Sequence, residues 1–234
     1  PREGPGDFES TKKAFSLMNN HPEKPKILDI GSGPGKQTLD LAKLCNGFIY
    51  AVDLHLPYLE ELNKIIRDTG LSSRVFTDQS DMNSLIYKNE YFDIIWAEGS
   101  IYIIGFENGL KSWRKYLKKN GYMAVTEVSW LKKDPPKELI NFWNREYPNI
   151  KYSEENLSII KNVGYEVIDS FVLPENAWWD DYYNNIEQKL SQLRVKYKDD
   201  KEVIEVLENE QSEIDMYRKY SSYYGYVFYI MKKM

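Results

Sequence analysis

The sequence predicts an α/β domain in which a doubly wound parallel sheet of seven strands is covered by helices. Short runs of β-branched and aromatic residues alternate with segments of helical periodicity, the order typical of parallel sheets. A glycine-rich turn joins the first of these strands to a helix. The chain has 234 residues, 42% of them hydrophobic, which is enough to bury the core of one such domain.

Each expected element follows from its local pattern. Seven strands are predicted from short apolar runs bounded by turn residues, at Lys26–Ile30, Phe48–Asp53, Arg74–Thr77, Phe92–Ala97, Tyr122–Val128, Tyr165–Leu173 and Tyr226–Met231. Helical spacing predicts helices before and between them, at Thr11–Met18, Lys36–Leu44, Leu56–Thr69, Phe106–Leu117 and Glu154–Asn162.

A long helical insertion is expected between the sixth and seventh strands. Helical spacing continues there through the apolar positions Tyr182, Ile186, Leu190, Leu193 and Tyr197, and again through Val203, Leu207, Ile214 and Tyr217. Lys198–Asp200 is predicted to be the turn of a helical hairpin. We therefore expect one domain over 1–234, with an N-terminal helix and lid segment at 1–22 and inserted cap segments at 131–150 and 175–222.

Charge and composition favour a small-molecule partner. The net charge is −5 and the basic runs are no longer than pairs such as Lys118-Lys119, whereas a nucleic-acid-binding face is normally basic. No apolar run approaches the roughly 18 residues of a membrane span, and we expect no signal peptide and no membrane partner. Cys45 is the only cysteine, which excludes an intrachain disulfide and fits a cytoplasmic protein. We expect a monomer or a homodimer.

The strongest local signal is Gly31-Ser32-Gly33-Pro34-Gly35, between an apolar strand and a helix. Glycines in such a turn adopt positive φ and let a ligand approach the backbone, beside the free N–H groups of the helix start. The spacing fits neither the dinucleotide fingerprint nor the phosphate-binding P-loop. Asp53 ends the next strand, where a carboxylate can accept both hydroxyls of a ribose. In this order the features indicate a cofactor that contains adenosine.

These motifs resemble those of the class I S-adenosylmethionine-dependent methyltransferases, and most closely their ubiquinone/menaquinone-biosynthesis-like branch. Leu28–Gln37 is similar to the first family motif, and the resemblance continues through Asp53-Leu54, Ser80-Asp81-Met82, Phe92–Gly99 and Gly121–Val128. It covers roughly residues 25–130 and the last two strands. It implies a Rossmann-like sheet whose last strand is antiparallel, S-adenosylmethionine as cofactor and S-adenosylhomocysteine as product.

The resemblance also implies roles for single residues. Asp29 and Gly31 would face the methionine end of the cofactor, and Gly33 and Gly35 would permit close approach of the backbone. Asp53 would bind the ribose, Leu54 would flank the adenine, and Asp81 and Met82 would bind its edge. The full set of expected cofactor-binding residues is Asp29, Gly31, Ser32, Gly33, Gly35, Gln37, Asp53, Leu54, Asp81, Met82 and Glu98. A plain alternative for Asp81 is the N-cap of a short helix beginning near Met82.

The methyl acceptor is not identified by any motif. The Asp/Asn-Pro-Pro-Tyr/Phe motif of amino-methylating enzymes is missing after the fourth strand, where Ala97-Glu98-Gly99-Ser100 stands. No cluster with metal-ligand spacing occurs, so we expect no metal. Glu98 and Tyr102 are the candidate catalytic residues, because ligands of open α/β sheets bind at the carboxyl ends of the strands. Candidate acceptor-binding residues are Arg2, Tyr102, Trp130, Trp178 and Trp179.

Other interpretations stay open at this point. The aromatic residues of the insertion can line a pocket for a planar or cationic acceptor, or can simply pack against the sheet. Gly4-Pro5-Gly6 can act as a lid over the cofactor or be a plain terminus. The chain can also be an inactive module that only binds the cofactor, or another nucleotide-cofactor enzyme, such as an NAD-dependent oxidoreductase or an aminopropyl transferase similar to spermidine synthase.

Overall fold

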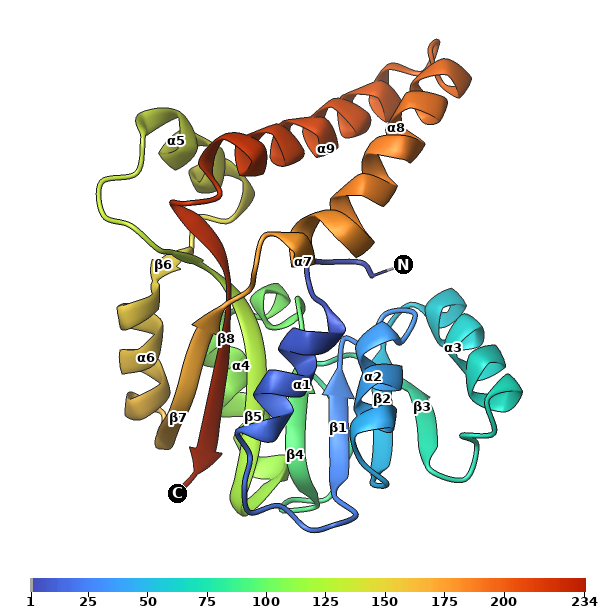
Figure 1. The fold of residues 1–234 in the computed structure, drawn as a ribbon, viewed down its shortest axis with the longest axis vertical. Coiled ribbons are helices and arrows are strands. Elements are labelled where there is room, and N and C mark those ends of the chain that lie inside the picture. Colours follow the sequence, from blue (N-terminus) through green and yellow to red (C-terminus); the bar gives the residue numbers. More distant parts are fainter. Residues whose placement is uncertain (1) are drawn as a thin grey trace.

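The computed structural model describes residues 2–234 and contains a central sheet covered by helices on both faces (Figure 1). Its main strands run in the order β3-β2-β1-β4-β5-β8-β7, and β6 pairs with the end of β5. All pairings are parallel except those of β8, which is antiparallel to β5 and β7. The strands are β1 Lys26–Ile30, β2 Phe48–Asp53, β3 Val75–Gln79, β4 Phe92–Ala97, β5 Leu117–Trp130, β6 Lys151–Tyr152, β7 Tyr165–Val172 and β8 Tyr224–Lys233.

The predicted doubly wound fold with an antiparallel last strand is confirmed. The two-residue β6 was not expected, because a strand of that length leaves no hydropathy pattern. Parallel strands that are covered on both faces need a nearly continuous apolar sequence. The whole of β4 is accordingly buried, as are four of the five residues of β1.

The helices divide between the two faces of the sheet. Apolar side chains of α1, α2 and α3 pack on one face, and those of α4 and α6 pack on the other. The helices are α1 Phe8–Ser16, α2 Lys36–Leu44, α3 Leu56–Asp68, α4 Phe106–Trp113, α5 Lys137–Glu146, α6 Ser153–Asn162, α7 Asn176–Trp178, α8 Asn184–Lys196 and α9 Lys201–Tyr220. Shorter turns are η1 Ile101–Ile103 and η2 Arg114–Tyr116, both 3₁₀, and η3 Trp179–Tyr183, a π-helical turn.

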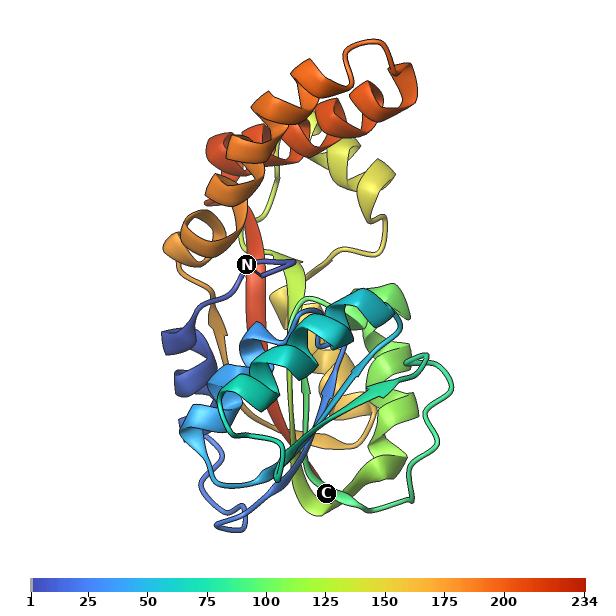
Figure 2. The ribbon, with the colours of Figure 1, turned by 90° about the vertical axis from the view of Figure 1, so that its right-hand side faces the viewer.

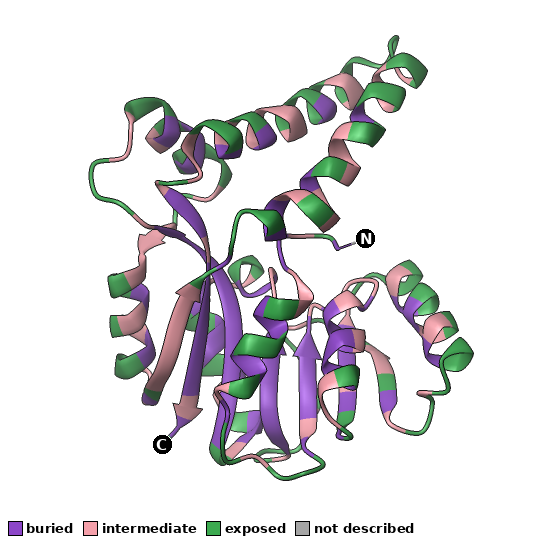
Figure 3. Ribbon diagram, viewed as in Figure 1, coloured by how far each residue is buried: buried purple, intermediate pink, exposed green. Residues whose placement is uncertain are grey.

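A helical cap stands over the carboxyl ends of the strands. It consists of α5 and the hairpin of α8 and α9, which projects from the body (Figures 1 and 2). The hairpin lies between β7 and β8, which confirms the predicted insertion. Asp200 caps α9, since its side chain accepts a hydrogen bond from the Val203 N–H. The buried side of the hairpin faces α5 and the top of the sheet, while its outer side is exposed (Figure 3).

Several boundaries differ from the sequence prediction. The N-terminal helix begins at Phe8 because Asp7 accepts a hydrogen bond from the Ser10 N–H and caps it. No helix begins near Met82; the Asp81 side chain instead accepts a hydrogen bond from the Asn83 N–H, at 2.8 Å, and forms a turn. Strand β5 is longer than expected at both ends. Within residues 2–234, no helix has both the length and the apolar composition that crossing a membrane requires.

Candidate functional site

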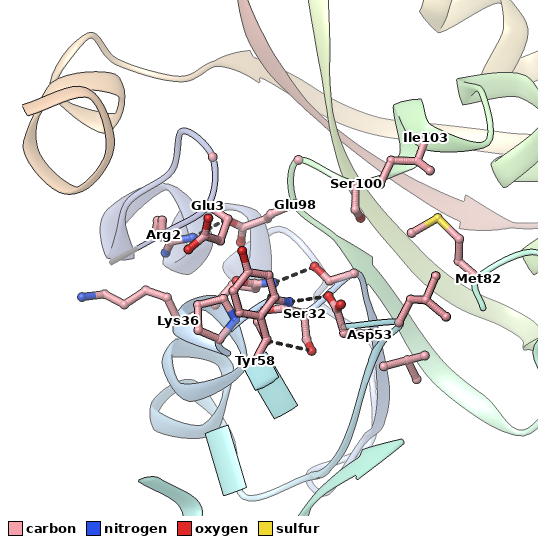
Figure 4. A pocket seen from close by; sticks show the side chains of 18 of the residues that line it. Arg2, Glu3, Ser32, Lys36, Asp53, Tyr58, Met82, Glu98, Ser100 and Ile103 are labelled. Atoms are coloured by element: carbon pink, nitrogen blue, oxygen red, sulfur yellow. Dashed lines mark hydrogen bonds and ion pairs between the residues drawn. The ribbon is translucent and has the colours of Figure 1, made fainter. Parts of the chain in front are cut away.

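A cleft of about 430 Å³ opens at the carboxyl ends of the strands (Figure 4). Its walls come from the N-terminal segment, the glycine-rich turn, the ends of β2 and β3, and the loop after β4. Of the residues that the sequence singles out, those that line the cleft are Arg2, Gly31, Ser32, Gly33, Gln37, Asp53, Leu54, Asp81, Met82, Glu98 and Tyr102. Segments that are far apart in the sequence therefore meet at the place where open α/β sheets bind ligands.

The glycine-rich turn is held against the end of β2. Gly31 and Ser32 donate backbone hydrogen bonds to the Val52 carbonyl, at 2.8 and 3.0 Å. Gly31 and Gly33 have φ of +72° and +52°, a conformation that residues with a side chain rarely adopt. A Cβ on Gly33 would meet no atom closer than 3.8 Å. The Gly33 backbone thus presents an open surface to the cleft, which a ligand can approach.

Asp53 connects the turn to the neighbouring strand. Its Oδ2 accepts a hydrogen bond from the Gly33 N–H, and its Oδ1 accepts one from the His55 N–H, both at 2.8 Å. A carboxylate can accept about four hydrogen bonds, so Asp53 can still accept two hydroxyl donors from a ligand. The carboxylate is therefore fixed in position by the backbone on one side and open to the cleft on the other.

The wall opposite the turn is mostly apolar. Leu54, Met82 and Ile103 line it, and the Met82 carbonyl is held by a hydrogen bond from Trp113 Nε1 at 3.0 Å. Asp81 stands at the edge of this wall, and its hydrogen bonds with Asn83 hold the pKa of its carboxyl below the usual value. An apolar wall with an ionised carboxylate at its edge suits a flat ring that carries an amino group.

The N-terminal segment closes one side of the cleft. Arg2 is buried and donates hydrogen bonds to Glu98 Oε2 at 2.8 Å and to Asp40 Oδ2 at 3.0 Å. Gly6 continues the attachment, because its N–H donates to the Ala177 carbonyl of α7. Glu3, Gly4 and Pro5 lie between these anchors and line the cleft. Residues 2–6 therefore form a strap along this side of the cleft.

Glu98 is fully engaged by protein donors. Its Oε1 accepts hydrogen bonds from the Thr11 hydroxyl and from Trp96 Nε1, each at 2.8 Å, while its Oε2 accepts the bond from Arg2. These contacts anchor the strap and α1 to the end of β4. We therefore do not propose a proton-transfer role for Glu98, in contrast to the sequence-based expectation.

Two residues expected at the cofactor lie behind the cleft instead. Asp29 is wholly buried, and its Oδ2 accepts a hydrogen bond from the Thr38 hydroxyl at 2.5 Å. Burial raises the pKa of this carboxyl to about 7. Gly35 caps α2 in a left-handed conformation, where a Cβ would lie 2.3 Å from Leu62. Neither lines the cleft, so both position the turn from behind.

The three tryptophans proposed for the acceptor do not line the cleft either. Trp130 and Trp178 are buried, and Trp178 stacks on Tyr217 of α9 with ring centroids 4.1 Å apart. Trp179 packs against the same aromatic cluster and lies under the Arg218 guanidinium. Of the two interpretations of the cap aromatics, helix packing is the one that describes these rings.

A carboxylate that the sequence analysis overlooked lies beyond Tyr102. Glu127 of β5 is only 3% exposed, and its Oε1 accepts a hydrogen bond from the Tyr147 hydroxyl at 2.6 Å. Its Oε2 has no hydrogen-bond partner among the described residues. Burial raises the pKa of Glu127 to about 7. The signal was present in the sequence as a single charged residue inside an apolar strand.

The pKa of Glu127 predicts that the free energy of unfolding falls as the pH rises. Its usual value of 4.5 is raised to about 7 in the folded protein, so the folded state holds this proton more tightly than the unfolded chain does. The stability is fully present below the unfolded pKa and is lost as the pH passes the folded one, by about 3 kcal/mol at most. Urea unfolding at about pH 5 and pH 8 measures this slope.

The variant Glu127→Gln should flatten the slope, while the exposed control Glu107→Gln should leave it unchanged. The titratable groups around Glu127 are Tyr147, Lys151, Tyr102, Tyr226 and Tyr229. None of them is a carboxyl group. The pKa values of Asp29, Glu210 and Glu213 are also raised, and these groups contribute to the slope that remains. An identical slope in Glu127→Gln and the wild type would contradict the assignment.

Within residues 2–234, no three His, Cys, Asp or Glu side chains come together in a group that could hold a metal ion. The cleft instead offers backbone N–H groups, the carboxylates of Glu3, Asp53, Asp81 and Glu98, and an apolar wall. This donor set suits an organic ligand with hydroxyl and amino groups.

Comparison with known proteins agrees with the resemblance seen in the motifs. Residues 27–121 match the family model described as a methyltransferase domain. Over 126 residues the chain is 34% identical to the ubiquinone/menaquinone biosynthesis C-methyltransferase UbiE of Wigglesworthia glossinidia brevipalpis, covering 50% of this chain and 48% of that one. It is 29% identical to the methyltransferase GfsG of Streptomyces halstedii, covering 44% of this chain and 37% of that one. The chain thus spans about half or less of the length of these curated relatives.

Solved structures share the fold over nearly the whole length. The SAM-dependent methyltransferase from Geobacter sulfurreducens, in complex with S-adenosyl-L-homocysteine, is 17% identical with a TM-score of 0.84, covering 100% of this chain and 94% of that one. YjhP from E. coli is 18% identical with a TM-score of 0.85, covering 100% and 95%. At these identities the likeness shows the fold alone. The predicted resemblance is thereby confirmed, in sequence over residues 27–121 and in fold over the described chain.

Proposed function

We propose that this class I methyltransferase domain, similar in sequence to UbiE, transfers a methyl group from S-adenosylmethionine to a small-molecule acceptor and releases S-adenosylhomocysteine. The observation that carries the proposal is the pairing of the Gly33 backbone with Asp53 in one cleft. The turn is open to a ligand where a Cβ would otherwise stand, and the carboxylate beside it is fixed by two N–H donors. Relatives crystallised with S-adenosyl-L-homocysteine share the fold.

The cleft residues fit the parts of such a cofactor. Asp53 would accept the ribose hydroxyls, and Leu54 and Met82 would hold the adenine between apolar surfaces. Asp81 would accept the adenine amino group, because its carboxylate is ionised at the edge of that wall. The backbone of Gly31, Ser32 and Gly33 would carry the methionine end. Gln37 holds this backbone in place, since its Nε2 donates to the Ser32 carbonyl at 3.1 Å.

The chain's part in the chemistry is alignment and exclusion of water. When bound, the cofactor supplies an electrophilic methyl group on a sulfonium, and the acceptor must approach it in line. Residues 2–6 would close the cleft over the cofactor, anchored by Arg2 at one end and by Gly6 at the other. Release of product would need this strap to open. Proton transfer would be left to residues on the acceptor side.

The acceptor side would be built from the cap, that is, the segments 131–150 and 175–222 of a single domain. We place a small molecule there, in keeping with the net charge of −5 and the lack of a basic run in the sequence. UbiE, which matches part of the chain, is described as acting in quinone biosynthesis. We further propose that the protein acts in the cytoplasm as a monomer or a homodimer, without a nucleic-acid or membrane partner.

Calorimetric titration of the purified chain with S-adenosylmethionine, S-adenosylhomocysteine and NAD in parallel tests the proposal. We expect micromolar binding of the first two and none of NAD. Binding of NAD alone would identify an oxidoreductase, and binding of none of the three would contradict the proposed function. Tight cofactor binding without methyl transfer to any metabolite extract would instead favour the inactive binding module.

A further inference from the structure

The buried Glu127 is costly unless a ligand completes its hydrogen bonds. It lies near the carboxyl end of β5, is 3% exposed, and has Tyr147 as its single hydrogen-bond partner. Its Oε2 is buried without a partner among residues 2–234. A buried, incompletely bonded carboxyl destabilises a fold by the desolvation of that oxygen. An unpartnered buried oxygen of this kind is a candidate contact for a donor from outside the chain.

The surroundings of Glu127 are aromatic and electronegative. Tyr147, Tyr102 and Tyr226 all lie close enough for its charge to raise their pKa values. A second carboxyl, the half-buried Glu213 of α9, acts on Tyr102 and Tyr226 from the cap side. Among residues 2–234, Lys151 is the one cation whose charge acts on Glu127. Of the two cations that line the cleft, Arg2 pairs with Glu98 and Asp40, and Lys36 pairs with Asp181 at 3.4 Å.

Short contacts connect this group to the cofactor cleft. Tyr102 lines the cleft, is 44% exposed, and has its ring centroid 6.0 Å from that of Tyr147. Gly99, which also lines the cleft, donates its N–H to the hydroxyl of Thr126, the residue before Glu127, at 2.7 Å. Glu127 does not line the cleft itself, but it lies behind two of the residues that do, on the side where an acceptor would enter past Tyr102.

We propose that Glu127 binds the methyl acceptor, that the acceptor is an amine with an aromatic or apolar body, and that Glu127 removes a proton from its nitrogen. The inference rests on the proposed function. The ammonium gives one proton to Glu127 Oε2, which leaves a neutral amine with a free lone pair. That lone pair forms the bond to the methyl carbon while the carbon–sulfur bond breaks and its electron pair stays on sulfur. The proton on Glu127 then passes to solvent.

An amine fits these surroundings better than an anion does. The buried Glu127 and the half-buried Glu213 repel a carboxylate or a phosphate, whereas they attract an ammonium. Tyrosine rings add to this preference, because their faces attract cations. A pKa of about 7 also suits Glu127 to take a proton near neutral pH.

Matched probes test the acceptor class. 2-Phenylethylamine, 2-phenylethanol and 3-phenylpropanoate share a phenyl ring and differ in the polar end. Each is titrated by calorimetry into protein saturated with S-adenosylhomocysteine. We expect the amine to bind about ten-fold more tightly than either of the others, the loss typical of one missing hydrogen bond to a charged group. Equal or tighter binding of the alcohol or the carboxylate, or no measurable binding of the amine, would overturn the inference.

Variants then assign the effect to Glu127. Glu127→Gln should lose at least about ten-fold in amine affinity, and Tyr147→Phe about three-fold, while the exposed control Glu107→Gln keeps the wild-type value. The rate of amine methylation should rise with pH in the wild type and lose that rise in Glu127→Gln. Wild-type affinity for the amine in Glu127→Gln would contradict the inference. If Glu127→Gln does not fold, unchanged amine affinity in Tyr147→Phe would contradict it instead.

Cofactor binding separates this inference from the proposed function. S-adenosylhomocysteine should bind the wild type and every variant alike, because none of the substituted residues lines the cofactor cleft. A wild type that fails to bind S-adenosylhomocysteine would contradict the proposed function itself. Normal cofactor binding without a preference for the amine contradicts only the acceptor class and the role of Glu127.

Discussion

Replacing Asp53 with alanine is expected to weaken the binding of S-adenosylhomocysteine about 100-fold, because two hydrogen bonds to a charged group are lost together. The Asp53 carboxylate is proposed to accept the ribose hydroxyls. It also holds the turn through the Gly33 N–H at 2.8 Å. Alanine removes both contacts, so the ligand loses its partner and the turn loses its anchor. Calorimetric titration measures the affinity, and thermal unfolding checks that the fold persists.

Two further substitutions sharpen this test. Asp53→Asn keeps one acceptor oxygen and should lose less affinity than Asp53→Ala. Asp68→Ala removes an exposed carboxylate at the end of α3, far from the cleft lining, and should leave the affinity unchanged. Affinity for S-adenosylhomocysteine in Asp53→Ala equal to that in Asp68→Ala would mean that the ribose does not bind at Asp53.

The strands were predictable because their burial imposes a continuous apolar sequence. β1, β2 and β4 begin and end where the hydropathy pattern places them. β5 begins at Leu117, earlier than predicted. The prediction missed this start because the polar residues Lys118, Lys119 and Asn120 interrupt the apolar pattern there, where the pairing with β4 shifts its register. A polar stretch at an irregular end of a sheet reads as a loop, since no periodicity distinguishes the two.

The cofactor side of the cleft was predictable because its residues are set by local geometry. The turn at Gly31 and Gly33 needs glycine for its positive φ, and Asp53 follows from the end of an adjacent strand. Asp29 departs from this rule. It precedes the turn by two residues, yet it points away from the cleft to Thr38, because alternate residues of a strand face opposite sides.

The proposed acceptor side was not predictable, because its contacts join residues distant in the sequence. The hydrogen bond from Tyr147 to Glu127 forms only because the end of α5 returns to β5. The sequence predicts Trp178 as an acceptor-binding residue, but it stacks on Tyr217, which belongs to the second helix of the hairpin. Which face of a short helix is buried depends on the element that packs against it. The hydropathy of an aromatic residue does not show which way its side chain points.

Replacing Gly31 with alanine is expected to destabilise the fold by about 3 kcal/mol or more, through two separable effects. A φ of +72° is strained for any residue with a side chain. The new Cβ would also lie 2.4 Å from Ser100 Cβ, and Ser100 is buried with its hydroxyl bonded to the Ile30 carbonyl. Residues 31 and 100 cannot move apart without a cost in free energy, because each follows directly on the end of a central strand. Urea unfolding measures the loss.

Gly70→Ala separates these effects, because Gly70 has a nearly identical φ of +70° and a Cβ there would meet nothing within 4 Å. It should lose only the conformational part, about 1–2 kcal/mol. Adding Ser100→Gly to Gly31→Ala removes the overlapping atoms and should restore at least about 1 kcal/mol, which a double-mutant cycle reports as coupling. Equal losses for Gly31→Ala and Gly70→Ala, without coupling to Ser100, would show that the turn yields to the new side chain. The close fit of the turn against the β4 loop would then not be what shapes the cleft.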